Sequence, residues 1–271
     1  MQLELISAAN REFSRLIPIK RIRQFLRPRR ETSAPLFVFG MQRSGTTLLL
    51  DILEKSLDTR IYHEANPEAF KNFRLVNFSD RQTLVAREYI RWVVFKPICD
   101  LQHADRLLNQ HVGGKGVWIF RHYADVAESY VTEWDDFAIK TIRRIAAGRG
   151  KPDWIHERIT PEMKSEVIRF SKRGLTPHSA AALLWYVRNR FYFDYELDQR
   201  DDDCLLVHYE ALVTNPEAEV ERMCDFLHIP YKRSFANGIH ANSVQKNSAR
   251  QIDVKVKHLC DALYERFRAL L

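Results

Sequence analysis

The sequence predicts an α/β fold of the doubly wound type, in which helices cover a central parallel sheet on both faces. Five short apolar runs of strand length alternate with helical segments along the chain. The run at residues 117–120 is apolar at every position, as expected of a strand that is covered on both faces. No linker long enough to divide the 271 residues is present, so we expect a single domain over residues 35–271 after a basic N-terminal arm over residues 1–34.

The strands are expected at residues 36–40, 59–63, 92–96, 117–121 and 204–209. The helices are expected at residues 46–56, 67–74, 101–110, 124–132, 135–147, 161–172, 177–197, 216–227 and 254–271, with Pro67 in the first turn of the second helix. Those between residues 133 and 200 form a helical insert before the last strand. Ligands of such folds bind beyond the carboxyl ends of the strands, so we expect the functional residues there.

The first strand leads into the loop GMQRSGTT at residues 40–47, and an apolar helix follows it. The spacing of its glycines fits the phosphate-binding pattern G-x-x-x-x-G-K-[ST], in which backbone amides and a helix N-terminus surround an anion. Thr46 stands where that pattern requires lysine, which argues against ATP or GTP and for another phosphorylated ligand. Arg43 supplies a planar fork for phosphate or sulfate oxygens, and Ser44 and Thr47 supply hydroxyls. The alternative is a segment that only caps a helix.

A second candidate anion site follows the fourth strand. Arg121 ends that strand, and Ser129 lies eight residues later, about two helical turns away. A bend after Arg121 would bring both side chains onto one anion. Ser129 alone is equally compatible with a hydroxyl on a helix face.

These two motifs, in this order and each at a strand end, resemble the sulfotransferase family that uses 3′-phosphoadenosine 5′-phosphosulfate (PAPS). The resemblance covers about residues 36–250 and is closest in motif pattern to protein-tyrosine and bacterial carbohydrate sulfotransferases. It implies a P-loop-containing nucleotide-binding fold, PAPS as donor, adenosine 3′,5′-bisphosphate (PAP) as product, and no metal. The residues implied to hold the 5′-phosphosulfate are Arg43, Ser44, Gly45, Thr46 and Thr47, and those implied to hold the 3′-phosphate are Arg121 and Ser129.

The resemblance also implies two catalytic residues. Glu64, seventeen residues after Thr47, matches a glutamate that acts as general base on the acceptor hydroxyl. The alternative is that Glu64 favours the N-terminus of the helix expected at Pro67. His63 is the rival base, although the family's catalytic histidine follows the third strand, where this chain has Pro97 and Ile98. Lys96 resembles the lysine that stabilises leaving-group charge, with a surface lysine as the alternative.

Three further positions resemble the family's donor site. Tyr209 is expected against the adenine ring, and Ser243 and Lys246 resemble a late loop that closes over the donor. The aromatic segment at residues 185–193 either lines an acceptor pocket or belongs to the core, and helical spacing favours the core.

Composition limits the partners. The net charge is +7, and residues 1–34 hold eight basic against three acidic residues, so the rest of the chain is nearly neutral. This excludes a general nucleic-acid binder. The arm is expected to be a solvated helical segment at one edge, with contact to anionic lipid or an acidic partner as the alternative. Pro18 and Pro28 exclude a long helix within it.

The sequence shows no apolar run of transmembrane length and no signal peptide. The four cysteines are widely spaced and predict buried free thiols in a reducing compartment, so we expect a cytoplasmic protein. They are Cys99, Cys204, Cys224 and Cys260.

The functional hypothesis is sulfuryl transfer from PAPS to a hydroxyl of a sugar, tyrosine, lipid or small molecule, by a monomer or homodimer. A P-loop small-molecule kinase and a nucleotide-binding module without catalysis are the alternatives. The missing loop lysine counts against the kinase, and the presence of Glu64 and Lys96 counts against the module.

Overall fold

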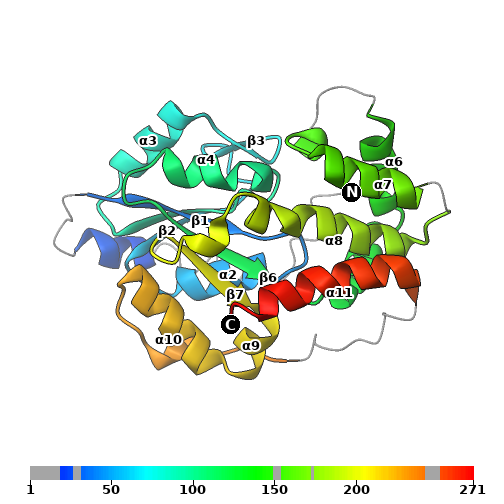
Figure 1. Ribbon diagram of the computed structural model, residues 1–271. Coiled ribbons are helices and arrows are strands. Elements are labelled where there is room, and N and C mark those ends of the chain that lie inside the picture. Colours follow the sequence, from blue (N-terminus) through cyan, green and yellow to red (C-terminus); the bar gives the residue numbers. More distant parts are fainter. Residues whose placement is uncertain (1–18, 27–31, 149–153, 172–173, 242–250) are drawn as a thin grey trace.

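A computed structural model describes residues 19–26, 32–148, 154–171, 174–241 and 251–271. Its centre is a five-stranded parallel sheet in the order β2-β5-β1-β6-β7 (Figure 1). The strands are β1 (Ala34–Phe39), β2 (Thr59–Tyr62), β5 (Trp92–Phe95), β6 (Lys115–Phe120) and β7 (Cys204–His208). All five predicted strands are confirmed. Because β1 pairs with β5 on one side and β6 on the other, the loop after β1 leaves from the middle of the sheet.

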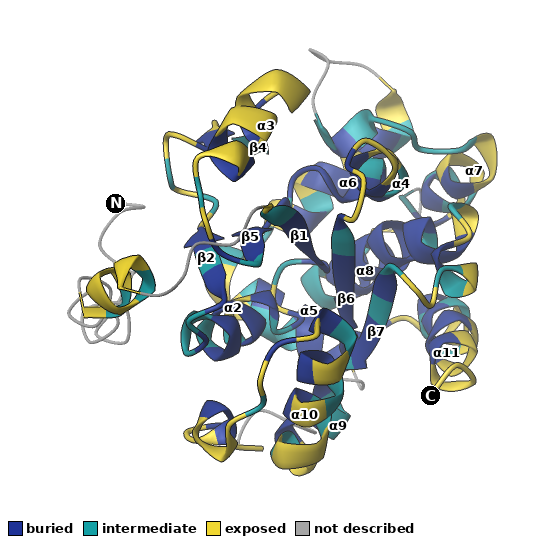
Figure 2. Cartoon of the chain, turned by 90° about the vertical axis from the view of Figure 1, so that its left-hand side faces the viewer, coloured by how far each residue is buried: buried dark blue, intermediate teal, exposed yellow. Residues whose placement is uncertain are grey.

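The two faces of the sheet carry separate apolar layers, because alternate residues of a strand point to opposite faces. On one face, Leu36 and Val38 of β1 pack with α2 (Thr46–Glu54), α9 (Tyr209–Thr214) and α10 (Pro216–Leu227). On the other, Phe37 and Phe39 belong to the larger core with α4 (Ala104–Asn109), α5 (Tyr123–Trp134), α8 (Pro177–Asp194) and α11 (Val254–Arg268). Figure 2 shows the buried strands between helices whose outer sides are exposed. The predicted fold class is confirmed.

The helical insert contributes mainly to the larger core. It consists of α6 (Phe137–Ala147), α7 (Pro161–Ser171) and α8, with a short 3₁₀ turn at Trp154–His156. Trp185 and Phe191 of α8 are fully buried, so the aromatic segment at residues 185–193 is core. The remaining 3₁₀ turns lie at Leu101–His103, Leu197–Gln199 and Arg233–Ala236.

The helix predicted at residues 67–74 is wrong. That segment contains the short antiparallel strands β3 (Phe70–Lys71) and β4 (Arg74–Leu75). The turn between them places Asn72 at φ 51° and Phe73 at φ 63°, and two successive left-handed residues cannot belong to an α-helix. The interpretation of Glu64 as a helix N-terminal charge therefore fails.

Two described helices were not predicted, α3 (Phe78–Ala86) and α9, and a short helix covers residues 19–25 of the predicted arm. The four cysteines are buried and free, as the sequence predicts. Among the described helices, none combines the length and the apolar character needed to span a bilayer.

Candidate functional site

The loop after β1 has the backbone of an anion-binding turn. Arg43 adopts φ 71° and Gly45 φ 101°, and Gly45 is the N-cap of α2. None of the described side chains caps this helix, so the interpretation of the segment as a simple cap is not supported. The Ser44 side chain is fully buried, and its hydroxyl has no hydrogen-bond partner among the described residues. A buried unpartnered hydroxyl beside uncapped amides fits a site whose polar groups bind a ligand anion.

Tyr209 packs against this loop. A Cβ atom on Gly45 would lie 2.4 Å from Cδ2 of the Tyr209 ring, so only glycine allows this contact. The guanidinium carbon of Arg121 lies 4.5 Å from the centroid of the same ring. Tyr209 therefore joins the loop to the end of β6. Its contact with adenine stays a prediction.

The two predicted anion motifs meet in space. Arg43 donates from Nε to Oγ of Ser129 over 2.9 Å, and Arg121 donates from Nη1 to the Arg43 carbonyl over 3.3 Å. Arg121 also pairs with Asp125 at 3.6 Å, and Trp185 donates from Nε1 to the Arg121 carbonyl at 3.0 Å. Residues 43, 121 and 129 thus form one cluster, although 78 and 86 positions separate Arg43 from its two partners.

Arg43 has two further contacts that the sequence did not suggest. Its Nη1 lies 3.5 Å from Oε2 of Glu133, and its guanidinium carbon lies 5.8 Å from the Trp134 ring centroid. Both partners are in the last turn of α5, one turn beyond Ser129. α5 therefore positions the loop arginine through three side chains.

The candidate catalytic residues form a second cluster. Lys96 Nζ lies 2.6 Å from Oε1 of Glu64 and 3.3 Å from Oγ1 of Thr47. The strand order explains the arrangement, because β2, β5 and β1 are neighbours and these residues follow their carboxyl ends. The Lys96 side chain is only 6% exposed, which excludes a surface lysine, and that of Glu64 is 23% exposed. The lysine therefore connects the candidate base to the phosphate loop.

His63 is next to this cluster, and the charge state of its imidazole depends on Lys96 and Glu64. Surrounding protein desolvates the imidazole, and the Lys96 ammonium acts in the same direction, so both lower the pKa of His63. The Glu64 carboxylate opposes them. A lowered pKa keeps His63 neutral at pH 7, so its rivalry with Glu64 as base stays open.

Sequence reasoning missed Asp51, one turn after Thr47 on α2. Burial raises the pKa of Asp51 to about 6, against the opposing charges of Lys96 and Lys55. Because the folded-state pKa is above the unfolded one, this carboxyl contributes stability below about pH 4 that is lost as the pH rises through 6. A carboxylate that costs stability at neutral pH is typical of a functional site.

Asp51→Asn is therefore expected to stabilise the protein at pH 7.5 by about 1–2 kcal/mol, after a discount for partial exposure, and to have little effect at pH 4. Urea denaturation at both pH values measures this. Asp225 is an exposed aspartate on α10, and Asp225→Asn is the control. It should leave the free energy of unfolding unchanged at both pH values. Destabilisation by Asp51→Asn at pH 7.5 would contradict the argument.

Two of the predicted donor contacts, Ser243 and Lys246, lie outside the described residues. Within the described ranges, no group of three or more His, Cys, Asp or Glu side chains is arranged to hold a metal ion.

A model of the sulfotransferase family matches residues 158–233. Similar solved structures include a sulfotransferase domain from the curacin biosynthetic pathway (15% identity, 88% of this chain and 98% of that one, TM-score 0.49). A sulfotransferase from Alicyclobacillus acidocaldarius is 17% identical, covers 88% of this chain and 94% of its own, and has a TM-score of 0.49. Mouse sulfotransferase SULT7A1 complexed with PAP is 15% identical, covers 88% of each chain, and has a TM-score of 0.48. Among curated protein sequences, none matches this chain.

The family match covers the end of the helical insert, β7, α9 and α10, and contains neither of the two anion motifs. It is thus independent of these two motifs, although it includes Tyr209. Motifs and family model point to the same conclusion: the resemblance of this chain to the sulfotransferase family is confirmed.

Proposed function

We propose that this protein transfers a sulfuryl group from PAPS to an acceptor hydroxyl, with Glu64 as general base. The observation that carries the proposal is the position of Lys96, whose ammonium group contacts both the Glu64 carboxylate and the Thr47 hydroxyl of the phosphate loop. The proton acceptor and the charge that stabilises a departing phosphate are thereby held together at the end of the anion-binding loop. The family match supports sulfotransfer as the reaction.

The donor supplies the sulfuryl group and a phosphate leaving group. Glu64 accepts the proton of the acceptor hydroxyl while that oxygen forms a bond to sulfur. The bond between sulfur and the bridging oxygen breaks in line, and its electron pair leaves with PAP. Lys96 and Arg43 stabilise the negative charge that develops on the bridging and equatorial oxygens.

The donor fits the polar groups around the loop. The uncapped amides of α2 and the hydroxyls of Ser44, Thr46 and Thr47 would hold the 5′-phosphosulfate. Arg121 and Ser129 would hold the 3′-phosphate, with Tyr209 beside the adenine. This donor has no γ-phosphate, which accounts for a loop without the usual lysine.

The test is a transfer assay with ³⁵S-labelled PAPS and pools of sugars, peptides, lipids and small hydroxyl compounds, with and without magnesium. We expect labelled product without magnesium, and mass spectrometry then identifies the acceptor. Magnesium-dependent transfer of phosphate from ATP would instead establish the kinase alternative. If the protein binds PAP but transfers label to none of the pools, the remaining alternative is a nucleotide-binding module without catalysis.

Arg121→Met is expected to weaken PAP binding by about 100-fold and to leave the affinity for adenosine 5′-monophosphate within about threefold, because a charge-assisted contact to the 3′-phosphate is removed. Calorimetric titration with PAP and with adenosine 5′-monophosphate measures how far the variant has lost its preference for PAP. Since the change leaves Asp125 buried without this partner, Arg121→Met/Asp125→Asn is the matched control for folding. An equal loss for both nucleotides would contradict the assignment of Arg121.

A further inference from the structure

The helix at residues 19–25 is attached to the protein by its polar side. Lys20 donates to the Glu54 carbonyl at 2.8 Å and pairs with the Glu54 carboxylate at 3.2 Å. Gln24 donates to the carbonyls of Leu57 and Thr59, both at 3.0 Å. Lys20 and Gln24 are four residues apart and share one helix face. That face is directed inward, onto the end of α2 and the start of β2.

The opposite side of this helix is apolar and exposed. The exposed fractions are 50% for Ile19, 61% for Ile22, and 76% each for Phe25 and Leu26. At 100° per residue these side chains form one continuous stripe opposite Lys20 and Gln24. Four large apolar residues on one exposed face constitute a docking surface rather than scattered surface residues. We call it the outer stripe.

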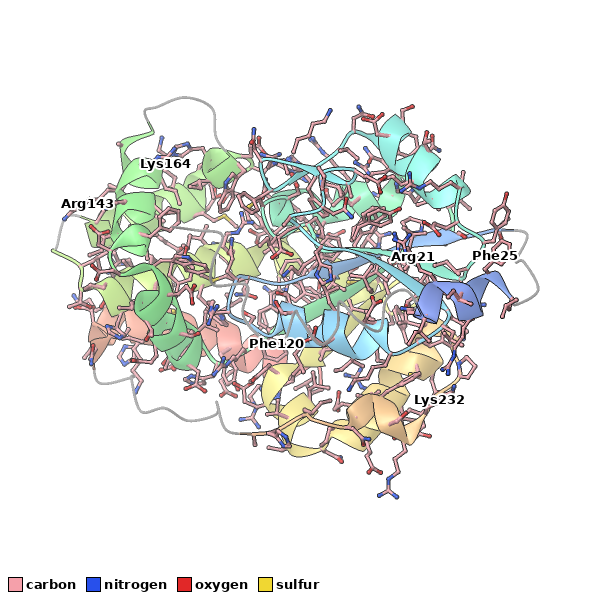
Figure 3. The ribbon with its side chains drawn as sticks, turned by 180° about the vertical axis from the view of Figure 1, so that it is seen from behind. Arg21, Phe25, Phe120, Arg143, Lys164 and Lys232 are labelled. Carbon is pink, nitrogen blue, oxygen red and sulfur yellow. The ribbon has the colours of Figure 1, made fainter. Side chains whose placement is uncertain are left out.

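Cationic side chains border the outer stripe on both sides. Arg21 and Arg23 are exposed and lie on either flank of the stripe by helical spacing. Arg21 and Phe25 also line a cavity of about 200 Å³ with Arg60, the half-exposed Tyr89 and Glu88, whose carboxylate pairs with Arg60 at 3.6 Å (labelled in part in Figure 3). By sequence, Arg27, Arg29 and Arg30 follow directly. An apolar face flanked by arginine and tyrosine has the chemistry of a bilayer interface with anionic headgroups.

We propose that the outer stripe docks this protein onto an anionic lipid surface. Ile19, Ile22, Phe25 and Leu26 enter the boundary between headgroups and acyl chains, while Arg21 and Arg23 meet lipid phosphates and carboxylates. A water-soluble protein partner would have to supply both an apolar groove and acidic rims, whereas an anionic membrane offers both along its whole surface. The charge of the flanks is the observation that selects lipid as the occupant.

Docking in this way sets the orientation of the active site. The helix contacts Leu57 and Thr59 at the amino end of β2, whereas the phosphate loop lies at the carboxyl end of β1. The nine residues of α2 separate these two places, which is about 14 Å at 1.5 Å per residue. Figure 1 shows the helix and the loop at opposite ends of the sheet. The donor site therefore opens away from the membrane, toward acceptors dissolved in water.

The experiment is vesicle co-sedimentation of the full chain, with phosphatidylcholine alone and with phosphatidylserine added, at low and high salt. We expect binding only to the anionic vesicles and weaker binding at high salt. Ile22→Ser/Phe25→Ser/Leu26→Ser should lower the partition coefficient at least about tenfold without changing turnover of a soluble acceptor. Leu270→Ser/Leu271→Ser changes an exposed apolar pair at the C-terminus, at the far side of the molecule in Figure 2, and should bind normally.

Three results would overturn the proposal. Equal binding of the triple variant, or equal binding to neutral vesicles, would show that the outer stripe or its charge is not used. Conversion of a dimer to a monomer by the triple variant, seen by size exclusion, would assign the stripe to a second copy. A lower melting temperature of the triple variant in a protein that binds no vesicles would show that the stripe is covered by the chain itself.

Discussion

Glu64→Gln is expected to lower kcat by about 10²- to 10⁴-fold, the range for loss of a general base, while PAP affinity changes by less than about threefold. Glutamine keeps the shape of the side chain and can still accept a hydrogen bond from Lys96, but it cannot take the acceptor proton. The residues proposed to bind the donor are elsewhere, at the loop after β1 and at Arg121. The loss should therefore appear in kcat rather than in donor binding.

Steady-state transfer of ³⁵S to the acceptor from the screen gives kcat, and calorimetry with PAP gives the affinity. Glu68→Gln is the matched control, because this exposed glutamate pairs with Arg87 and not with Lys96. His63→Asn separates the rival base: a loss comparable to that of Glu64→Gln would give both residues a part in proton transfer. Wild-type turnover of Glu64→Gln would refute the base assignment.

The parts of the fold that the sequence predicted are those with strong local signals. Continuous apolar runs located four of the five strands, since a strand covered on both faces has no polar alternation to confuse it. The strand at Thr59–Tyr62 contains Thr59 and Arg60, so its signal was weaker. Glycine spacing located the loop between β1 and α2 that we propose to bind the donor phosphate. The wrong helix at residues 67–74 rested on one weak signal, a proline. Asn72 is of a residue type that is enriched at positive φ, but Phe73 is of a type that rarely adopts it, so the turn that the two residues form was not predicted.

The sequence predicted which residues belong to the candidate site, but not which of them contact one another. The sequence suggested Arg121 and Ser129 as one anion site and the loop of Arg43 as another, and the structure adds the hydrogen bonds that join the two. Glu133 and Asp51 had no signal in the sequence, because a single carboxylate on a helix gives no indication of its tertiary surroundings. Tertiary structure alone supplies what distinguishes them: Glu133 pairs with Arg43, and burial raises the pKa of Asp51 to about 6.

Lys96→Met is expected to lower kcat by about 10²- to 10³-fold, because the charge that forms on the leaving oxygen loses a preorganised cation. Lys55→Met is the matched control. Lys55 donates to the carbonyls of Phe235 and Asn237, so its loss should cost stability and leave turnover unchanged. Comparable kcat losses for both lysines would contradict a role for Lys96 in the transition state.

An NMR titration of His63 tests the same cluster without any acceptor. Lys96 lowers the pKa of His63 and Glu64 raises it, so Lys96→Met should move this pKa up and Glu64→Gln should move it down. A general loss of structure would expose the imidazole and move the pKa up in both variants, because desolvation is the largest cause of its lowering. Shifts of opposite sign would therefore show that Lys96 and Glu64 act on one site as charges. Shifts of the same sign would mean that the cluster does not hold together in solution.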